Sequence, residues 1–291
     1  SRQLMPLAFA CGWGGVITMV GTPPNIIATG ALKAAGLPTF SFFEFAWIGI
    51  PLSLAGMLYM MFIGKYLLPK VELDANQNIE QEIEAKTTST SKQMISGLIL
   101  LLVVVTMAIG IPGITLEMAA VIGAIVCVLT GCLTEKQAYG SIDWVTIFLF
   151  AGMMPIATSM DKTGAGALIA DWTVGLMGGT PSPMVVTAVL FLLSCTLTQF
   201  MSNTAASALL CPIGLAIAKQ LGADPKAVVM AIAVAASCAF ATPVGTPPNT
   251  LVLGPGNYKF MDYVKAGVPL VIVSFIVSII IIPMVWPFFP A

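Results

Sequence analysis

Long apolar runs separated by short polar stretches dominate the pattern of hydrophobic and polar positions along the chain. A helix that crosses a membrane needs about 20 mostly apolar residues, and several runs reach or approach that length. We expect membrane spans at residues 4–37, 45–68, 94–111, 116–133, 144–160, 228–253 and 268–288. Proline-containing polar segments interrupt the first and the sixth of these runs, so each is predicted as a broken helix. The pattern therefore predicts an all-α integral membrane protein.

Two polar stretches divide the apolar runs. Residues 69–93 carry eight charged side chains and a cluster of threonine and serine residues, which predicts a polar linker. If this linker is cytoplasmic, most lysines and arginines fall on the inner side, as is usual for membrane proteins. Residues 161–179 mix charged and apolar side chains and are too polar to cross, so we expect an interfacial amphipathic helix there.

Residues 183–221 are apolar at both ends and polar at the centre, and two structures fit this pattern. Two tight spans would leave only about 17 residues for each arm, which is at the short limit for crossing. A re-entrant hairpin, whose tip reaches the membrane interior, fits the polar centre better. The polar residues of this tip are Thr198, Gln199, Ser202, Asn203 and Thr204.

An internal repeat links the two broken runs. The segment Val-Gly-Thr-Pro-Pro-Asn occurs at 20–25 and again at 244–249. In the following spans, Glu44, Gly49 and Pro51 match Asp262, Gly267 and Pro269 at one common offset. Counting the spans between the copies sets the two broken helices in opposite directions, as in many secondary carriers. We expect residues 1–68 to end a first repeat, 69–93 to link the repeats, and 94–291 to form the second.

Each break should expose two helix ends inside the membrane. A proline pair cannot continue a helix, but it suits the first turn of the next one, which Asn25 or Asn249 can cap. The end of the first half-helix offers free carbonyls to a cation, and the start of the second offers amides to an anion. Gly21 and Gly245 permit close backbone approach. The side chains of Ser202, Asn203 and Thr204 can cap a helix or hydrogen-bond an oxyanion.

Composition narrows the chemistry that these breaks can carry. The chain of 291 residues is 58% hydrophobic and 9% charged, with a net charge of −1, so no basic surface for nucleic acid is expected. It contains no histidine, and its six cysteines lie in apolar stretches, which excludes most zinc sites and histidine-based nucleophile systems. No lysine or arginine lies deep in a predicted span, so a bound anion would need cations beside it. Sodium is preferred over protons, because no acidic residue lies mid-span.

Three motifs, in this order and spacing, resemble the divalent anion:sodium symporter family. They are Gly-Thr-Pro-Pro-Asn at 21–25, Ser-Asn-Thr at 202–204 within Leu-Thr-Gln-Phe-Met-Ser-Asn-Thr-Ala, and the stretch from Ala235 to Asn249 that ends in the second Gly-Thr-Pro-Pro-Asn. The resemblance covers essentially the whole chain. It implies an inverted-repeat secondary transporter with re-entrant hairpins, two broken helices and an elevator-like transport part, forming a homodimer in the cell membrane.

The resemblance also implies residue roles. Sodium (Na+) is held near the second hairpin and second break, and near the first break; the corresponding positions are Thr198, Met201, Asn203, Gly245 and Gly21. The small anionic substrate is held by the Ser-Asn-Thr tip and adjoining break residues, namely Ser202, Asn203, Thr204, Thr22, Thr246 and Pro247. The capping argument adds Asn25 and Asn249 to this substrate group.

One family feature is not found in this sequence. The family carries a first Ser-Asn-Thr hairpin upstream of the first break, so we expect this chain to be the C-terminal part of a longer carrier. The expected function is sodium-coupled symport of a C4-dicarboxylate, citrate or sulfate. The alternative is a sodium/proton or oxyanion antiporter of the same superfamily. A membrane enzyme or a channel is less favoured, because no convergent acid, base or metal group is visible within a span.

Overall fold

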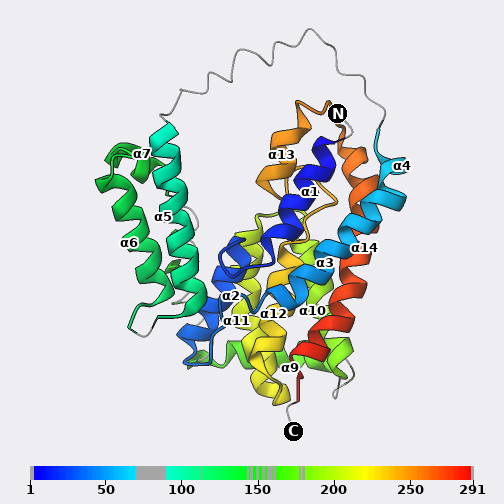
Figure 1. Ribbon diagram of the computed structural model, residues 1–291. Helices are drawn as coiled ribbons and strands as arrows, with labels where there is room; N and C mark the ends of the chain where they lie inside the picture. The colour runs from blue at the N-terminus through cyan, green and yellow to red at the C-terminus, as the bar shows by residue number, and fades with distance from the viewer. Residues whose placement is uncertain are drawn as a thin grey trace. The chain divides into compact units, whose positions relative to one another are not determined.

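In the computed structural model, helices are the regular secondary structure of the described residues, which are 3–69, 90–111, 113–142, 144, 147–148, 151–152, 155, 159, 162–176, 178 and 181–289. The elements are α1 (Leu4–Gly15), α2 (Pro23–Ala34), α3 (Ala46–Tyr59), η1 (Met60–Gly64), α4 (Lys65–Leu67), α5 (Thr90–Ile109), α6 (Leu116–Leu129), α7 (Glu135–Gly140), α9 (Ala165–Leu176), α10 (Pro183–Thr198), α11 (Asn203–Leu221), α12 (Pro225–Ala236), α13 (Pro247–Leu253) and α14 (Phe260–Val285), most of which are labelled in Figure 1.

Several of these helices are long and apolar enough to cross a membrane. Within the described part of the chain, four segments qualify, namely Ala46–Leu67, Ser91–Ile109, Asn203–Leu221 and Phe260–Val285. The first of them is one continuous segment made of α3, the π-helical turn η1 and α4. The expectation of an all-helical protein with membrane-length helices is therefore confirmed.

Both broken helices are interrupted beside the repeated motif. The first break spans residues 16–22, between α1 and α2, and the second spans 237–246, between α12 and α13. The first break thus begins earlier than the expected position at Gly21. Each proline pair lies in the first turn of the second half-helix, where the missing proline N–H has no helical acceptor to lose.

The two broken helices run side by side in opposite directions. Helix α1 packs against α13, and α2 packs against α12, so the first half of each broken helix lies beside the second half of the other. At the start of α1, the backbone N–H of Met5 donates to the hydroxyl of Tyr258, which follows α13, at 3.1 Å. The helix breaks therefore face each other near the middle of the pair (Figure 1).

The span that follows each break packs against that same break through a glycine. A Cβ atom on Gly49 of α3 would lie 2.7 Å from Cα of Ile17, in the first break. A Cβ atom on Gly267 of α14 would overlap the carbonyl group of Phe240 and lie 2.8 Å from Cα of Ala241, in the second break. Phe240 and Ala241 stand in the same place relative to the second motif as Val16 and Ile17 relative to the first. The repeat is therefore present in the packing as well as in the sequence.

Helix α12 forms the centre of this arrangement. Every side chain from Ala227 to Ala236 is buried, because α12 is surrounded by α2, α10, α11 and α14. Helices α10 and α11 form a helical hairpin whose turn, at residues 199–202, lies against the second break.

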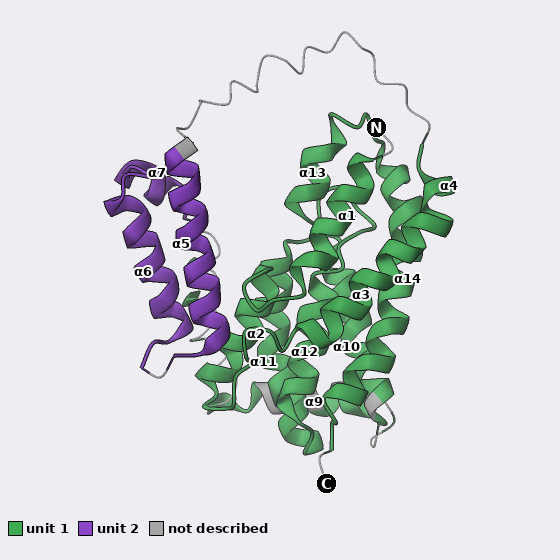
Figure 2. Cartoon of the chain, viewed as in Figure 1, with its two compact units in different colours: residues 1–73, 145–291 green, residues 74–144 purple. Residues whose placement is uncertain are grey.

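The chain forms two compact units, drawn in Figure 2, and each is described by itself. Unit 1 comprises residues 1–73 and 145–291, and unit 2 comprises 74–144. In unit 2, α5 packs against α6, and the hydroxyls of Thr115 and Thr134 cap α6 and α7. Unit 1 contains both broken helices and the α10–α11 hairpin. The expected division into two repeats at the linker 69–93 stays a prediction. Most of that linker and of the span expected at 144–160 lies outside the described residues.

Candidate functional site

Four oxygen-bearing groups converge where the turn of the α10–α11 hairpin meets the second break. The Thr198 hydroxyl, at the end of α10, donates to the carbonyl oxygen of Ala236, the last residue of α12, at 2.8 Å. With its nitrogen turned toward them, the Asn203 side-chain amide lies 2.6 Å from Thr198 Oγ1, 3.1 Å from the Ala236 carbonyl oxygen and 3.0 Å from the Gly245 carbonyl oxygen. We call Thr198, Asn203, Ala236 and Gly245 the oxygen cluster.

The oxygen cluster has the chemistry of a site for a small monovalent cation. Carbonyl oxygens from the unwound part of a broken helix are typical ligands of coupling ions in carriers. A half-turn of the Asn203 carboxamide exchanges its nitrogen for its oxygen, and the cluster then presents only oxygen atoms. None of its four residues is charged, so a bound cation would keep its charge to attract an anion beside it.

The atoms around Gly245 leave no room for a side chain at this position of the oxygen cluster. A Cβ atom there would lie 2.8 Å from Cβ of Ala239 and 3.0 Å from the carbonyl oxygen of Thr198. Both distances are shorter than the usual contact between such atoms. Only glycine therefore lets the second break approach the end of α10 this closely.

Gln199 joins the hairpin turn to the second break through its side chain. Its amide nitrogen donates to the carbonyl oxygens of Cys195, at 3.0 Å, and Cys238, at 3.1 Å. Its amide oxygen accepts from the backbone N–H of Ala241 at 3.0 Å. The hydroxyl of Thr242 in turn donates to the Gln199 carbonyl oxygen at 2.8 Å. The break is thus held to the hairpin by paired polar groups and not by packing alone.

A cavity of about 450 Å³ opens beside the oxygen cluster. Its lining includes four residues that the sequence placed in the site, Met201, Ser202, Gly245 and Pro247, together with Phe200, Val244, Thr250 and Leu251. The Ser202 hydroxyl caps α11 by accepting from the backbone N–H of Ala205 at 3.1 Å. Thr204 follows in the first turn of that helix, partly exposed.

The first break reaches the second through Thr22. The hydroxyl oxygens of Thr22 and Ser237 lie 3.2 Å apart, which joins the start of α2 to the end of α12. Thr22 and Thr246 occupy the N-cap positions of α2 and α13 with nearly identical extended dihedrals. A Cβ atom on Gly21 would overlap the Gly15 carbonyl oxygen, so Gly21 too allows a close backbone approach.

The sequence suggested that Asn25 and Asn249 cap the half-helices, but this prediction is wrong. The N-cap residues are Thr22 and Thr246. Each asparagine lies in the first turn, is buried, and points its amide nitrogen back into its own break. Asn25 donates to the carbonyl oxygen of Thr18 at 2.9 Å, and Asn249 donates to the equivalent oxygen of Thr242 at 3.0 Å. The reason is that an amide has donors for the carbonyls that the break leaves unpaired. Neither residue lines the cavity beside the oxygen cluster.

The sequence did not single out Ala236, Gln199 or Ser237 as site residues. Ala236 contributes a backbone carbonyl, for which the side chain gives no signal. Gln199 and Ser237 are polar residues adjoining predicted site segments, and that position is the one signal that could have found them.

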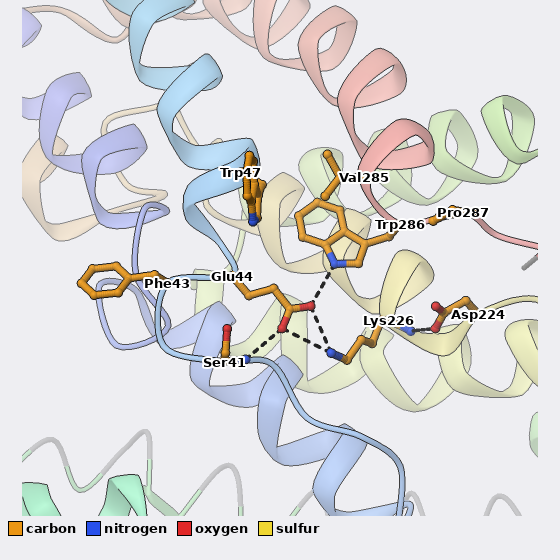
Figure 3. A pocket seen from close by; sticks show the side chains of 9 residues that line it. All are labelled: Ser41, Phe43, Glu44, Trp47, Asp224, Lys226, Val285, Trp286 and Pro287. Atoms are coloured by element: carbon orange, nitrogen blue, oxygen red, sulfur yellow. Dashed lines mark hydrogen bonds and ion pairs between the residues drawn. The ribbon is translucent and has the colours of Figure 1, made fainter. Parts of the chain in front are cut away.

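A second cavity, of about 500 Å³, lies at the end of unit 1 where α3 and α12 begin and α14 ends (Figure 3). There the Glu44 carboxylate accepts from the Lys226 ammonium group at 3.0 Å, from Trp286 Nε1 at 3.0 Å and from the Ser41 backbone N–H at 2.9 Å. Burial alone would raise the pKa of Glu44. The hydrogen bonds from Trp286, Ser41 and Lys226 outweigh burial, so this pKa lies below its usual value of 4.5.

Membrane-length helices, and an uncharged cluster of oxygen atoms beside a break in a helix, are features of membrane transport proteins. The sequence profile of the citrate transporter family (CitMHS) matches residues 1–210 and 202–290. The chain therefore belongs to this family. It is a multi-pass protein of the cell membrane and not an enzyme, as the sequence predicted.

Individual relatives agree with this assignment. The chain is 48% identical over 169 residues to the uncharacterized transporter YfbS of Escherichia coli, which covers 56% of this chain and 27% of that protein. It is 32% identical over 304 residues to an uncharacterized transporter of Haemophilus influenzae, covering 97% and 62%. It is 24% identical over 310 residues to the sodium-dependent dicarboxylate transporter SdcS of Staphylococcus saprophyticus, covering 98% and 58%. The chain thus spans about 60% of the length of the relatives that align along all of it.

Proposed function

We propose that this chain forms the larger part of a secondary active transporter that carries a divalent anion together with sodium. The observation that carries the proposal is the oxygen cluster, in which a hydroxyl, an amide and two backbone carbonyls, one at the end of α12 and one in the second break, meet without a charged side chain. A sodium ion fits such neutral oxygen ligands and supplies the positive charge that a dianion needs in a low-dielectric site. Similarity to a protein named as a sodium-dependent dicarboxylate transporter supports the same assignment.

In this proposal each site residue has a role. Thr198, Met201, Asn203 and Gly245 hold one sodium ion, and Gly21 contributes to a second at the first break. Ser202, Asn203, Thr204, Thr22, Thr246 and Pro247 hold the carboxylates of the substrate. Asn25 and Asn249 support the breaks from behind, since their amide nitrogens are already bound to break carbonyls.

We also propose that the fold is an inverted repeat with a re-entrant α10–α11 hairpin. The antiparallel packing of the broken helices and the contact of the hairpin turn with the second break support this interpretation. The proposed mechanism is elevator-like, with the site in unit 1 and unit 2 as part of the scaffold. A homodimer is the proposed assembly.

Uptake by the full-length protein in liposomes tests the proposed function. We expect an inward sodium gradient to drive accumulation of labelled succinate, with unlabelled citrate and sulfate as competitors to identify the preferred anion. Replacing sodium by choline should reduce uptake to the level of empty liposomes. Equal uptake in choline would refute sodium coupling.

One further measurement distinguishes the proposed symporter from the alternative, which is a sodium/proton or oxyanion antiporter. Antiport moves a proton or a second anion outward in exchange. A pH-sensitive dye trapped in the liposomes should therefore report no change that follows succinate uptake if the protein is a symporter. A sodium-dependent pH change without anion accumulation would favour the antiporter.

A further inference from the structure

The hydroxyls of Thr22 and Ser237 form a direct side-chain hydrogen bond between the two breaks. Thr22 is the N-cap residue of α2, yet its hydroxyl makes no capping bond to its own helix. Instead it lies 3.2 Å from the hydroxyl oxygen of Ser237, the C-cap residue of α12. Ser237 is almost fully buried and Thr22 is half-buried, so the contact is partly shielded from water.

Either hydroxyl can be the donor in this contact. The Ser237 hydroxyl also reaches the carbonyl oxygen of Ala233 at 3.1 Å. A serine hydroxyl has one proton, so while Ser237 donates to Ala233, Thr22 is the donor in the contact between the two hydroxyls. If Thr22 turns its O–H toward a bound carboxylate, Ser237 can turn its own O–H toward Thr22, and the pair stays satisfied. No proton is transferred in this exchange, because both hydroxyls only rotate.

Ser237 is also the direct neighbour of the oxygen cluster. It follows Ala236, whose carbonyl oxygen accepts from Thr198. A cation that draws in the Ala236 carbonyl oxygen therefore acts on the peptide unit that leads into Ser237. Because the Ser237 hydroxyl is hydrogen-bonded to Thr22, a shift of Ser237 changes the position of the Thr22 side chain on the other broken helix.

This link occurs once and is not duplicated by the repeat. The residue that stands in the place of Ser237 relative to the first motif is Trp13, which has no hydroxyl. Its carbonyl oxygen accepts from Ser53 of α3 at 3.3 Å, within the first repeat. The two breaks are therefore built alike but connected asymmetrically.

We propose that Ser237 is a positioning residue that couples cation binding at the second break to anion binding by Thr22 at the first. This inference rests on the proposed function, because it assigns the cation and the anion to those breaks. Such coupling is reciprocal, so sodium should strengthen anion binding by the factor by which the anion strengthens sodium binding. Removing the Ser237 hydroxyl should lower that common factor.

The test uses the full-length protein in liposomes and labelled succinate as the probe. The half-saturating succinate concentration is measured at several sodium concentrations for the wild type and for Ser237→Ala. At saturating sodium, we expect this concentration to rise roughly threefold to tenfold in Ser237→Ala, the change that the loss of one partly buried hydrogen bond produces. Its dependence on sodium should also become shallower, which a purely structural role would not explain.

Ser194→Ala is the matched control. The buried Ser194 hydroxyl donates to the carbonyl oxygen of Ile232 in the same helix α12 at 2.9 Å, but it does not reach the first break. This variant should keep the wild-type dependence on sodium. Thr22→Val provides a double-mutant cycle, since it should cost less succinate affinity in the Ser237→Ala background than in the wild type.

The outcomes separate the two proposals. If the wild type depends on sodium but Ser237→Ala keeps the wild-type half-saturation at every sodium concentration, the coupling role is refuted and the proposed function stands. If the wild type itself takes up succinate without sodium, both are refuted. Should Ser237→Ala fail to fold, Ser237→Cys takes its place, and the weaker thiol donor should give an intermediate loss.

Discussion

The Thr198 hydroxyl is the side chain on which the oxygen cluster depends most directly. It contacts both the Asn203 amide and the Ala236 carbonyl oxygen. Thr198→Val keeps the shape and removes the hydroxyl, so the half-saturating sodium concentration for succinate uptake should rise roughly tenfold. Thr196→Val, at an exposed position two residues earlier on α10, should change nothing. An unchanged sodium dependence in Thr198→Val would place the cation elsewhere.

Substitution of Gln199 tests how much its hydrogen bonds to the second break stabilise the protein. Gln199→Leu is similar in size but leaves the Cys195 and Cys238 carbonyl oxygens and the Ala241 N–H without this partner. Each buried group left unpaired costs about 1 to 3 kcal/mol. The thermal unfolding midpoint in detergent should fall by roughly 5 to 10 °C.

The control for Gln199→Leu is Gln220→Leu on the exposed surface of α11. Its amide contacts the Asp171 carboxylate in an exposed setting, where water can replace the lost hydrogen bond. The midpoint should therefore stay near that of the wild type. If the unfolding midpoints of Gln199→Leu and Gln220→Leu shift equally, the hydrogen bonds of Gln199 stabilise the protein no more than those of an exposed glutamine.

The residues of the site differ in how far the sequence could predict them. Thr198, Asn203 and Gly245 belong to motifs with recognisable side-chain chemistry, and the structure brings them together. Ala236 acts through its backbone, and an alanine carries no signal of that. Asn25 and Asn249 were expected as caps, but the direction in which an amide points depends on unpaired carbonyls several residues away.

At the scale of the elements, each break is defined by the span that crosses it. Gly267 of α14 lies against the Phe240 and Ala241 backbone, with no room for a Cβ atom. Gly267→Ala should push α14 away from the break and lower both the unfolding midpoint and sodium-dependent uptake. Gly254→Ala is the control, because a Cβ atom there meets nothing within 4 Å. Uptake by Gly267→Ala at the wild-type rate would contradict a role for this crossing.

The repeat was visible in the sequence at this scale, but the limits of the breaks were not. Proline pairs mark where a half-helix begins, because the ring suits the first turn. The end of the preceding half-helix has no such marker. Residues 16–20 are mostly apolar and would continue α1 by composition, yet the close approach of Gly49 of α3 to Ile17 accompanies an irregular backbone there.

For the whole molecule, the sequence predicted two repeats joined by a linker at residues 69–93, but it did not define the compact units. The first broken helix packs against the second, although almost the full length of the chain separates them in sequence. Such packing depends on which apolar faces match in space. Composition and periodicity show that a face is apolar, but they do not show which other face covers it.

Glu44 and its hydrogen-bond partners, which we call the Glu44 cluster, join distant parts of unit 1; the partners are Ser41, Lys226 and Trp286. The charge of the Glu44 carboxylate makes this contact sensitive to acid. Side-chain exposures of 18% for Glu44 and 23% for Lys226 leave the ion pair partly shielded from water, so it should stabilise more than a surface pair does. The lowered pKa of Glu44 means that the folded protein favours the carboxylate. Its stabilising effect is therefore complete above pH 4.5 and is lost as the pH falls through the lowered pKa.

Comparison of the wild type with Glu44→Gln isolates this effect. At pH 7 the variant should unfold at a lower temperature than the wild type, because the charged acceptor for Lys226 and Trp286 is gone. Below pH 4.5 the difference between the two midpoints should shrink, since wild-type Glu44 then takes up a proton as well. Glu135→Gln, at an exposed position on α7, should match the wild type at both pH values. A difference between the Glu44→Gln and wild-type midpoints that does not change with pH would show that the cluster acts through shape and not through charge.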